Sequence, residues 1–334
     1  MDVTIRGAGI FGLSIGWACA ARGARVRVVD PYGIGAGSSG GIVGALSPHV
    51  PENWNEKKAF QLKSLLMAES WWTDAARAGG GDPGYRRSGR LQPIPDQAAL
   101  ERAREREAGA ATLWQGQAIW TVVPHTATDG WEPSGPSGFL IHDTLSARIN
   151  PRAALDCLAL AITARGGEIV PAADDEGAVV WATGYHDLAR MGVAGAGVKG
   201  QAALFRLDRR DAAQLLVDGL HVVPHDDGTV AIGSTSERDW SDPATTDHQL
   251  DALIEKARRL APPLADAPVI ERWAGVRPRS RSRAPLIGPH PAEAGAFIAN
   301  GGFKIGFGMA PLIAEVMADL ILDGTDRIPD DFRP

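Results

Sequence analysis

The strongest constraint on how this chain can fold is a glycine-rich loop near its start, Gly7–Gly12, with the sequence GAGIFG. Alternating apolar residues in Asp2–Arg6 predict a strand before the loop, and a helix-compatible stretch follows it as far as Arg22. Ala24–Val29 predicts a second strand, which is followed at once by Asp30. A strand, a loop, a helix and a second strand within about 30 residues form one βαβ unit. The start of the chain therefore predicts a dinucleotide-binding fold.

Each glycine of the G-x-G-x-x-G pattern has a physical role in such a unit. Gly7 permits the tight turn, Gly9 lets the backbone approach a pyrophosphate, and Gly12 lets the helix pack closely on the sheet. The helix N-terminus offers free N–H groups to the phosphates, and Asp30 is placed to accept hydrogen bonds from a ribose. The predicted binding segment also includes three neighbours, Ile10, Phe11 and Pro31. The alternative is a glycine-rich turn that only packs the helix, and the pattern does not choose between FAD and NAD.

Composition places the chain among ordinary globular proteins. Its 334 residues suffice for about two domains, and 34 Lys and Arg against 40 Asp and Glu give a net charge of −6. No global basic field therefore recruits nucleic acid. Both cysteines, Cys19 and Cys157, fall in helix-patterned segments, which argues against a disulfide and for a reducing compartment. There is no charged-then-apolar leader and no apolar run of roughly 20 residues, so we expect a soluble cytoplasmic protein with no membrane partner and no metal site.

The rest of the chain predicts a discontinuous domain organisation. Segments typical of a nucleotide-binding domain return near the middle and again at the end, with short strands, prolines and charged helices between them. We therefore predict a dinucleotide-binding domain made of residues 1–79, 147–198 and 284–334. Residues 80–146 and 199–283 are predicted to form a substrate domain inserted into it.

Later segments carry a family resemblance. The second flavin-contacting loop of the D-amino-acid oxidase, glycine oxidase and sarcosine oxidase family is similar to Gly35–His49 (GAGSSGGIVGALSPH). The family's W-x-G-x-R-P…P-x-x-G block resembles Glu271–His290 (ERWAGVRPRSRSRAPLIGPH), and its closing helix segment resembles Asn300–Leu322 (NGGFKIGFGMAPLIAEVMADLIL). Weaker family signatures match Val180–Gly184 and Gly233–Glu237 in the same order. The chain most resembles those members that are glycine oxidases of thiamine biosynthesis.

The resemblance implies an α/β fold, with a FAD-binding Rossmann-like domain of the glutathione-reductase type and an interleaved antiparallel α+β substrate domain. It implies FAD as the cofactor. Relatives with covalent flavin use a cysteine near the arginine block, and no cysteine follows Cys157, so the FAD is expected to be noncovalent. The further positions that the family pattern places at the cofactor are Ser38, Ser39, Gly44, Ala45, Leu46, Val170, Thr183, Gly184, Gly302, Phe303, Lys304, Ile305 and Gly306.

A closing helix is predicted over residues 310–322, with Pro311 in its first turn, where a missing N–H is no loss. In the family this helix start faces the pyrimidine edge of the flavin, where the helix dipole stabilises negative charge on the reduced ring. The alternative is an ordinary helix packed on the sheet, and the two roles are compatible.

The substrate site implied by the resemblance centres on Arg277, which matches the family's carboxylate-binding arginine. A planar guanidinium binds a carboxylate through two hydrogen bonds, although a surface ion pair is the alternative. Lys304 stands where close relatives carry a second arginine, so we expect it to assist the carboxylate or to supply positive charge during reoxidation. His221 stands where relatives often place a substrate-facing tyrosine, and His49 is predicted to line the flavin's face. Each histidine is otherwise a packed or surface residue.

These observations predict a FAD-dependent oxidase of a small amine or amino acid. Hydride passes from the substrate Cα to flavin N5, and O2 reoxidises the flavin with release of H2O2. One alternative is a tRNA-modifying FAD oxidoreductase that acts on a carboxymethylaminomethyl nucleoside. The alternating Arg279, Arg281 and Arg283 favour it slightly, and the negative net charge disfavours it. The others are a dehydrogenase with a non-oxygen acceptor and a regulatory protein that binds FAD without turnover.

Overall fold

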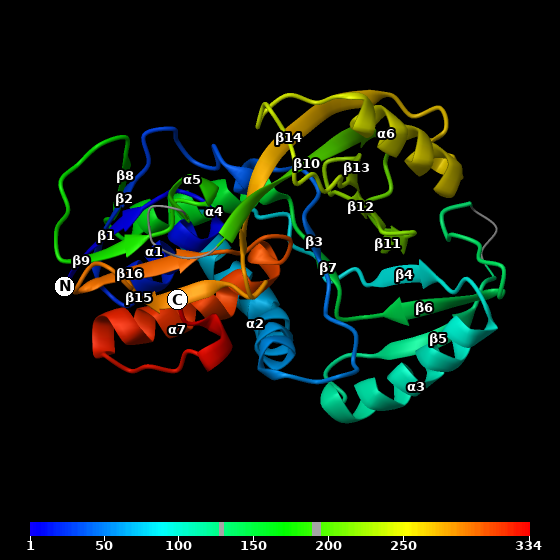
Figure 1. The fold of residues 1–334 in the computed structure, drawn as a ribbon, viewed down its shortest axis with the longest axis horizontal. Helices are drawn as coiled ribbons and strands as arrows, with labels where there is room; N and C mark the ends of the chain where they lie inside the picture. Colours follow the sequence, from blue (N-terminus) through cyan, green and yellow to red (C-terminus); the bar gives the residue numbers. More distant parts are fainter. Residues whose placement is uncertain (127–129, 189–194) are drawn as a thin grey trace.

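The computed structural model describes residues 1–126, 130–188 and 195–334 of the chain. Two large β-sheets lie side by side, with a small sheet of β3 (Ala45–Leu46) and β7 (Ala147–Arg148) between them (Figure 1). The six-stranded sheet has the order β15-β16-β9-β1-β2-β8, and the eight-stranded sheet has the order β14-β10-β13-β12-β11-β4-β6-β5. The predicted α/β fold with a second, mainly antiparallel part is confirmed.

The six-stranded sheet is built around β1, whose central residues are fully buried. Its strands are β1 (Asp2–Arg6), β2 (Arg25–Val29), β8 (Glu168–Val170), β9 (Ala178–Trp181), β15 (Leu286–Pro289) and β16 (Ala296–Asn300). All neighbouring strands run parallel except β15, which is antiparallel to β16. The carboxyl ends of β2, β1, β9 and β16 therefore meet at one edge, where an α/β sheet binds its ligands.

Helices cover this sheet. Those packed on its strands are α1 (Ile10–Ala21), α4 (Pro151–Ala164) and α7 (Gly306–Asp323). A further helix, α2 (Glu56–Gly79), packs on α4 and α7, and the short α5 (Tyr185–Leu188) contacts the eight-stranded sheet. The central helix, α1, packs against α4 and α7 as well as the sheet, so almost all its side chains are buried. Both cysteines lie buried and unpaired, in α1 and α4. No helix in the described ranges is both long and apolar enough to cross a membrane.

The eight-stranded sheet forms the other half of the molecule. Its strands are β4 (Arg90–Pro93), β5 (Trp120–Pro124), β6 (Phe139–Asp143), β10 (Gly195–Arg206), β11 (Gln214–Val217), β12 (Leu220–Pro224), β13 (Thr229–Gly233) and β14 (Val269–Ser280). The helices α3 (Gln97–Leu113) and α6 (His248–Leu260) pack on its two ends (Figure 1). The long pair β10 and β14 extends from this half toward the six-stranded sheet (Figure 1). This pair carries side chains of the second half to the edge of the first.

The two sheets divide the strands between separate stretches of the chain. Every strand of the six-stranded sheet falls in the ranges predicted for the dinucleotide-binding domain. The eight-stranded sheet uses the ranges predicted for the substrate domain, except that β10 already begins at Gly195. Residues 127–129 and 189–194 of the predicted domains lie outside the described residues. The exact domain boundaries stay a prediction.

The closing helix differs from its prediction. It begins at Gly306, so Pro311 lies inside α7 and its predicted place in the first turn is wrong. Proline has no N–H to donate to the carbonyl of Phe307, four residues earlier in the helix. The next N–H, that of Leu312, is bonded to Ser64 Oγ of α2, at 3.2 Å. The glycines after Ile305 disfavour a helix locally, and packing of α7 against α1 and α2 overrides that preference. The helix start therefore lies directly after the segment predicted to contact the cofactor.

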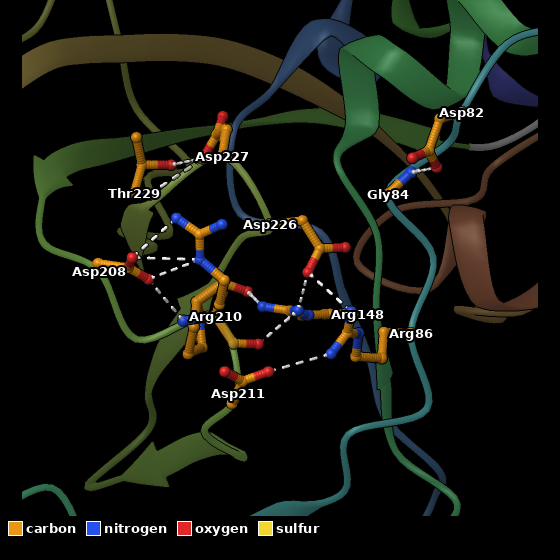
Figure 2. Close-up of polar contacts among 11 residues, drawn as sticks. Asp82, Gly84, Arg86, Arg148, Asp208, Arg210, Asp211, Asp226, Asp227 and Thr229 are labelled. Carbon is orange, nitrogen blue, oxygen red and sulfur yellow. Dashed lines mark hydrogen bonds and ion pairs between the residues drawn. The ribbon is translucent and has the colours of Figure 1, made fainter.

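A buried arginine joins the two halves (Figure 2). Arg148, at the end of β7, is fully buried and donates hydrogen bonds of 2.6 Å to the carbonyl oxygens of Pro224 and Arg210. It also forms an ion pair with Asp226 in the β12–β13 turn (Figure 2). In the same turn, His225 Nε2 donates to the carbonyl oxygen of Ile42, at 3.0 Å. These contacts fix the β12–β13 hairpin of the eight-stranded half against the second glycine-rich loop, Gly35–His49, of the six-stranded half.

The contact between α1 and the first loop leads to a stability prediction. A Cβ on Gly12 would lie 1.9 Å from the carbonyl oxygen of Gly7, which is backbone and cannot move aside. We expect Gly12→Ala to lower the free energy of unfolding by about 1–3 kcal/mol, as overpacking does. The matched control is Gly16→Ala in the same helix, where the new Cβ meets only flexible ends of Ile162 and Ile5 at 3.1 and 3.3 Å. Urea denaturation of both variants tests this, and equal stabilities would contradict it.

Candidate active site

A cavity opens at the carboxyl ends of β1, β2, β9 and β16 and holds about 1480 Å³ of empty space, its open mouth included. Residues of β12, β13 and β14 form the wall that faces the six-stranded sheet. The predicted site residues that line it are Gly7, Gly9, Ile10, Phe11, Asp30, Ser38, Ser39, Gly44, Ala45, Thr183, Gly184, His221, Arg277, Gly302, Phe303, Lys304 and Gly306. The cavity therefore unites residues from both halves of the chain.

The first glycine loop passes so close to neighbouring backbone that side chains are excluded. Gly7 has a φ of 112°, and a Cβ there would lie 2.4 Å from the carbonyl oxygen of Ala182, just after β9. A Cβ on Gly9 would lie 3.1 Å from Ser39 Oγ, in the second loop. The loop is thus bare backbone on the side that faces the cavity, as a close-lying pyrophosphate requires.

The second glycine-rich loop, Gly35–His49, is tied to the first, Gly7–Gly12, and to the chain before α4. Ser39 Oγ accepts a hydrogen bond from the N–H of Ile10, at 3.0 Å. Gly44 has a φ of 66°, and a Cβ there would lie 1.8 Å from the carbonyl oxygen of Ile149. The N–H of Ile149 donates in turn to the carbonyl of Gly44, at 3.0 Å. Both loops are held in place before any ligand enters.

Asp30 follows β2 and has two structural partners at the cavity. One carboxylate oxygen accepts from the N–H of Ala8 at 2.8 Å, and the other accepts from the N–H of Tyr32 at 2.9 Å. Each carboxylate oxygen has lone pairs left over. The carboxylate can therefore hold the first loop and bind a ribose at the same time.

Two helices begin at the cavity without a side-chain cap. The N-caps of α1 and α7 are Gly9 and Ile305, and neither helix has a side-chain cap hydrogen bond. The helices α2, α3, α4 and α6 begin instead with the capping residues Asn55, Asp96, Asn150 and Asp247. Thr183 Oγ1, on the cavity wall, is buried and has no hydrogen-bond partner among the described residues. Uncapped helix starts and an unpaired hydroxyl fit a ligand rich in acceptor oxygens, such as FAD.

Some predicted site residues lie outside the lining of the cavity. Those that do not line this cavity are Gly12, Pro31, Leu46, His49, Val170 and Ile305. The carbonyl of Val170 supports Asp30 by accepting its N–H at 3.1 Å. His49 is engaged with Gln61, whose Oε1 accepts the backbone N–H of His49 at 2.7 Å and contacts its ring Nδ1. Burial lowers the pKa of His49. Direct cofactor contacts of these residues stay predictions.

The cavity also contains residues that the sequence-based prediction missed, among them Asn300 and Ser234. Asn300 Nδ2 donates to the carbonyl of Gly184 at 2.9 Å, and its Oδ1 accepts from the N–H of Gly301 at 2.8 Å. It thereby joins the loops after β9 and β16, and a polar residue ending an apolar strand was a signal for it. Ser234 contacts Arg277, and no local sequence pattern reveals that pairing.

The W-x-G-x-R spacing follows from the alternation of a strand. Trp273, Gly275 and Arg277 lie two residues apart on β14, so they share one face of the sheet. Gly275 pairs with Gly200 of β10. A Cβ on Gly275 would lie 2.5 Å from the Trp273 indole, and one on Gly200 would lie 1.7 Å from Arg277 Nη2. Two glycines therefore form the floor on which the indole and the guanidinium lie.

Arg277 is a buried cation with neutral partners. Its side chain belongs to a residue only 8% exposed, and it donates to Ser234 Oγ at 2.6 Å and to the carbonyl of Thr235 at 3.4 Å. It forms no ion pair with any carboxylate in the described residues, and the nearby Glu237 is bonded to Gln201 at 3.0 Å. Burial lowers the pKa of Arg277 to about 10, against the opposing effect of Glu237. Arg277 therefore stays charged at neutral pH, and a buried charge of this kind is costly without an anionic partner.

Lys304 and His221 share the cavity with Arg277. Burial, and then the charge of Arg277, lower the pKa of the solvent-accessible Lys304. Burial lowers the pKa of His221 to about 4, and the charges of Arg90 and Lys304 add to this effect. His221 Nδ1 is buried without a hydrogen-bond partner among the described residues. The structure thus brings together three of the four predicted catalytic residues, with two of them charged and His221 neutral.

This fold and cavity are those of the two-domain flavin-dependent oxidoreductases. The chain belongs to the FAD dependent oxidoreductase family, whose sequence model matches residues 2–320. It is accordingly an oxidoreductase with FAD as its cofactor. The first glycine loop, Asp30, the second loop and the start of α7 line the cavity and stay the predicted contacts of that FAD.

Individual relatives resemble the chain to different extents. Glycine oxidase of Pseudomonas aeruginosa is 35% identical over 134 residues, which make up 40% of this chain and only 36% of that protein. A putative thiamine biosynthesis oxidoreductase of Rhizobium etli is 28% identical over 341 residues, 96% of this chain and 97% of that protein. The solved structure of iminodiacetate oxidase from Chelativorans sp. has a TM-score of 0.86 at 20% identity, covering 99% of this chain and 98% of that one. At that identity the likeness shows the fold.

The unpaired hydroxyl of Thr183 leads to a prediction about cofactor affinity. We expect Thr183→Val to weaken FAD binding about 5-fold, the effect of one lost hydrogen bond of about 1 kcal/mol. The melting temperature of the apoprotein should not fall, because the hydroxyl has no partner in the described protein. The matched control is Ser14→Ala, which removes another buried unpaired hydroxyl, away from the cavity, and should leave FAD affinity unchanged. Fluorescence titration with FAD measures both, and equal affinities of the two variants would refute the contact.

The depressed pKa of His221 leads to a prediction about pH. Because its folded-state pKa of about 4 lies below the ordinary 6.5, the unfolded chain binds more protons in this interval. Stability is therefore complete above pH 6.5 and is lost as the pH falls toward 4, by up to about 3 kcal/mol from this residue. We expect His221→Gln to lose less stability over the same interval. Urea unfolding at several pH values, with saturating FAD, compares the two proteins, and parallel pH profiles would contradict the assignment.

Proposed function

We propose that this protein oxidises the C–N bond of a small amine or amino acid in the cytoplasm, with O2 as the electron acceptor. The observation that carries the proposal is the buried guanidinium of Arg277, which lines the cavity and lacks a carboxylate partner among the described residues. Relatives named for glycine oxidation, thiamine biosynthesis and iminodiacetate oxidation support a small amino-acid substrate. The buried, unpaired cysteines are in keeping with a reducing compartment.

Arg277 has the first task in this chemistry. Its guanidinium binds the substrate carboxylate and so fixes the position of Cα, which lowers the entropic cost of reaching the reactive geometry. Gly200 leaves room for the guanidinium, and the hydrogen bonds to Ser234 and Thr235 hold it in place. When bound, the FAD supplies the redox chemistry, accepting hydride at N5 and passing the electrons to O2 to give H2O2.

The second task is to keep the amine of the substrate neutral. An amine must be neutral to be oxidised, and the positive charges of Arg277 and Lys304 disfavour the ammonium form. His221 is neutral because its pKa is about 4, and its unpaired Nδ1 can accept a hydrogen bond from the amine N–H. The released imine then reacts with water to give an oxo acid and ammonia or, from a secondary amine, a carbonyl compound and a smaller amine.

The direct test is an anaerobic screen of flavin reduction. The holoenzyme is mixed with glycine, sarcosine, D-amino acids, proline analogues and secondary amines, and bleaching of the flavin absorption band is followed. Bleaching by at least one of these compounds supports the proposal. Failure across the whole panel would favour a FAD-binding protein without turnover. The peroxide yield under air then separates an oxidase from a dehydrogenase with another acceptor.

The role of Arg277 leads to a kinetic prediction. We expect Arg277→Ala to lower kcat/KM at least about 30-fold, because truncation of one partner of a buried charge pair costs about 2–5 kcal/mol. Arg277→Lys should lie between this variant and the wild type, because it keeps the charge and loses the planar fork. FAD content should stay unchanged in both.

The matched control is Arg272→Ala. Arg272 lies on the same strand but on its opposite face, is exposed, and forms an ion pair with Asp251 at 2.7 Å. Its kcat/KM should stay within about 2-fold of the wild-type value, as expected for an exposed pair. Wild-type kcat/KM in Arg277→Ala on every substrate found would refute the carboxylate-binding role.

A further inference from the structure

Two cations line one end of the cavity without a carboxylate to neutralise them. Arg277 is nine-tenths buried and bonded to a hydroxyl and a carbonyl. Lys304 lines the same cavity, and its lowered pKa reflects both burial and the proximity of Arg277. Neither forms an ion pair with a carboxylate within residues 1–126, 130–188 and 195–334. One bound monocarboxylate neutralises only one of these charges.

The carboxylate that does line the cavity lies at its other end. Among the described lining residues, Asp30 is the only acid, and it follows β2, whereas Lys304 follows β16. The strands β1 and β9 separate β2 from β16, so three strand spacings of about 4.8 Å place the two ends about 14 Å apart. Asp30 is also bonded to the first glycine loop. The lining of the cavity around Arg277 therefore has two cations and no acid among the described residues, although the buried Glu237 behind it partly offsets the charge of Arg277.

Lys304 is held in place at this end. Its ammonium lies 5.8 Å from the centre of the Phe303 ring, and the guanidinium of Arg279 lies 5.8 Å from the same ring. Arg279 is itself bridged through its backbone to Gly302. Contacts of a cation with an aromatic face stabilise it without neutralising its charge. Lys304 is thus positioned beside the cavity with its charge available to a ligand.

We propose that the substrate carries two anionic groups and is an amino dicarboxylic acid. This proposal rests on the proposed function, because Arg277 must bind the α-carboxylate. The second carboxylate pairs with Lys304. A dicarboxylate pairs with both cations, whereas a monoacid such as glycine leaves Lys304 without an anionic partner. The preference for two carboxylates therefore arises when the substrate binds.

The first experiment measures binding without any redox chemistry. Diglycolate has the shape of iminodiacetate with an ether oxygen in place of the amine, so it has no C–N bond to oxidise. Calorimetric titration of the holoenzyme compares diglycolate with its monoamide, which keeps the shape and loses one charge. We expect diglycolate to bind at least about 10-fold more tightly, the effect of one added charge-assisted hydrogen bond. Equal dissociation constants would overturn the proposal.

Variants assign the second contact. Lys304→Met should reduce the preference for diglycolate to less than about 3-fold, and Lys304→Arg should restore it, because an arginine retains the charge. The matched control is Arg281→Gln, which removes one positive charge from an exposed position outside the cavity and should keep the full preference. A preference that survives in Lys304→Met would overturn the assignment to Lys304.

The second experiment follows flavin reduction with oxidisable pairs. Iminodiacetate and its monoamide place the second group on the nitrogen, and both hands of aspartate and glutamate place it on the side chain. We expect a dicarboxylic acid of one of these two kinds to reduce the flavin at least about 10-fold more efficiently than its monoamide or amide counterpart. Reduction by glycine or sarcosine, without any preference for two charges, would overturn this inference and leave the proposed function intact. Preferential binding of diglycolate in a protein that no amine reduces would support the two-anion site and overturn the proposed function.

Discussion

The dinucleotide-binding half depends on one close contact, the approach of Gly12 in α1 to the carbonyl oxygen of Gly7. Because no side chain intervenes, α1 begins directly at the edge of the six-stranded sheet, where its first residues Ile10 and Phe11 line the cavity. The neighbouring contacts follow from that position. Ser39 reaches the N–H of Ile10, and Asp30 reaches the N–H of Ala8. Two glycine loops and an acid are thereby preassembled around the place of the cofactor.

The eight-stranded half contributes side chains to the cavity by extending one strand over it. The strand β14 carries Arg277 across, and Arg148 holds the neighbouring hairpin against the second loop, so the relative position of the two halves is fixed by buried polar contacts. Burying Arg277 costs free energy that its neutral partners offset only in part. Under the proposed function, an anionic substrate removes that cost, so the same residue would both recognise and orient the substrate.

Much of the fold was predictable, because its elements carry local signals. The strands of the first βαβ unit show hydrophobic alternation, and the strand before Thr183 is an apolar run that ends at a polar residue and a glycine. The start of α7 was predicted wrongly. Gly306 and Gly308 disfavour a helix locally, and only contacts with α1 and α2, from distant parts of the chain, make one there. His49 was expected at the flavin, and its engagement with Gln61, twelve residues further on, leaves it behind the cavity wall.

The sequence by itself determined the dinucleotide cradle and the arginine block, because the G-x-G-x-x-G and W-x-G-x-R spacings encode local backbone geometry: a loop without side chains and one face of a strand. The tertiary structure alone decided that Arg277, Lys304 and His221 meet, since they come from β14, from the loop after β16 and from β12. It also decided their charges. Burial and the charges of Arg90 and Lys304 keep His221 neutral, and neither Arg277 nor Lys304 forms an ion pair with a carboxylate of the described residues. Both effects depend on distances between residues that are far apart in the chain.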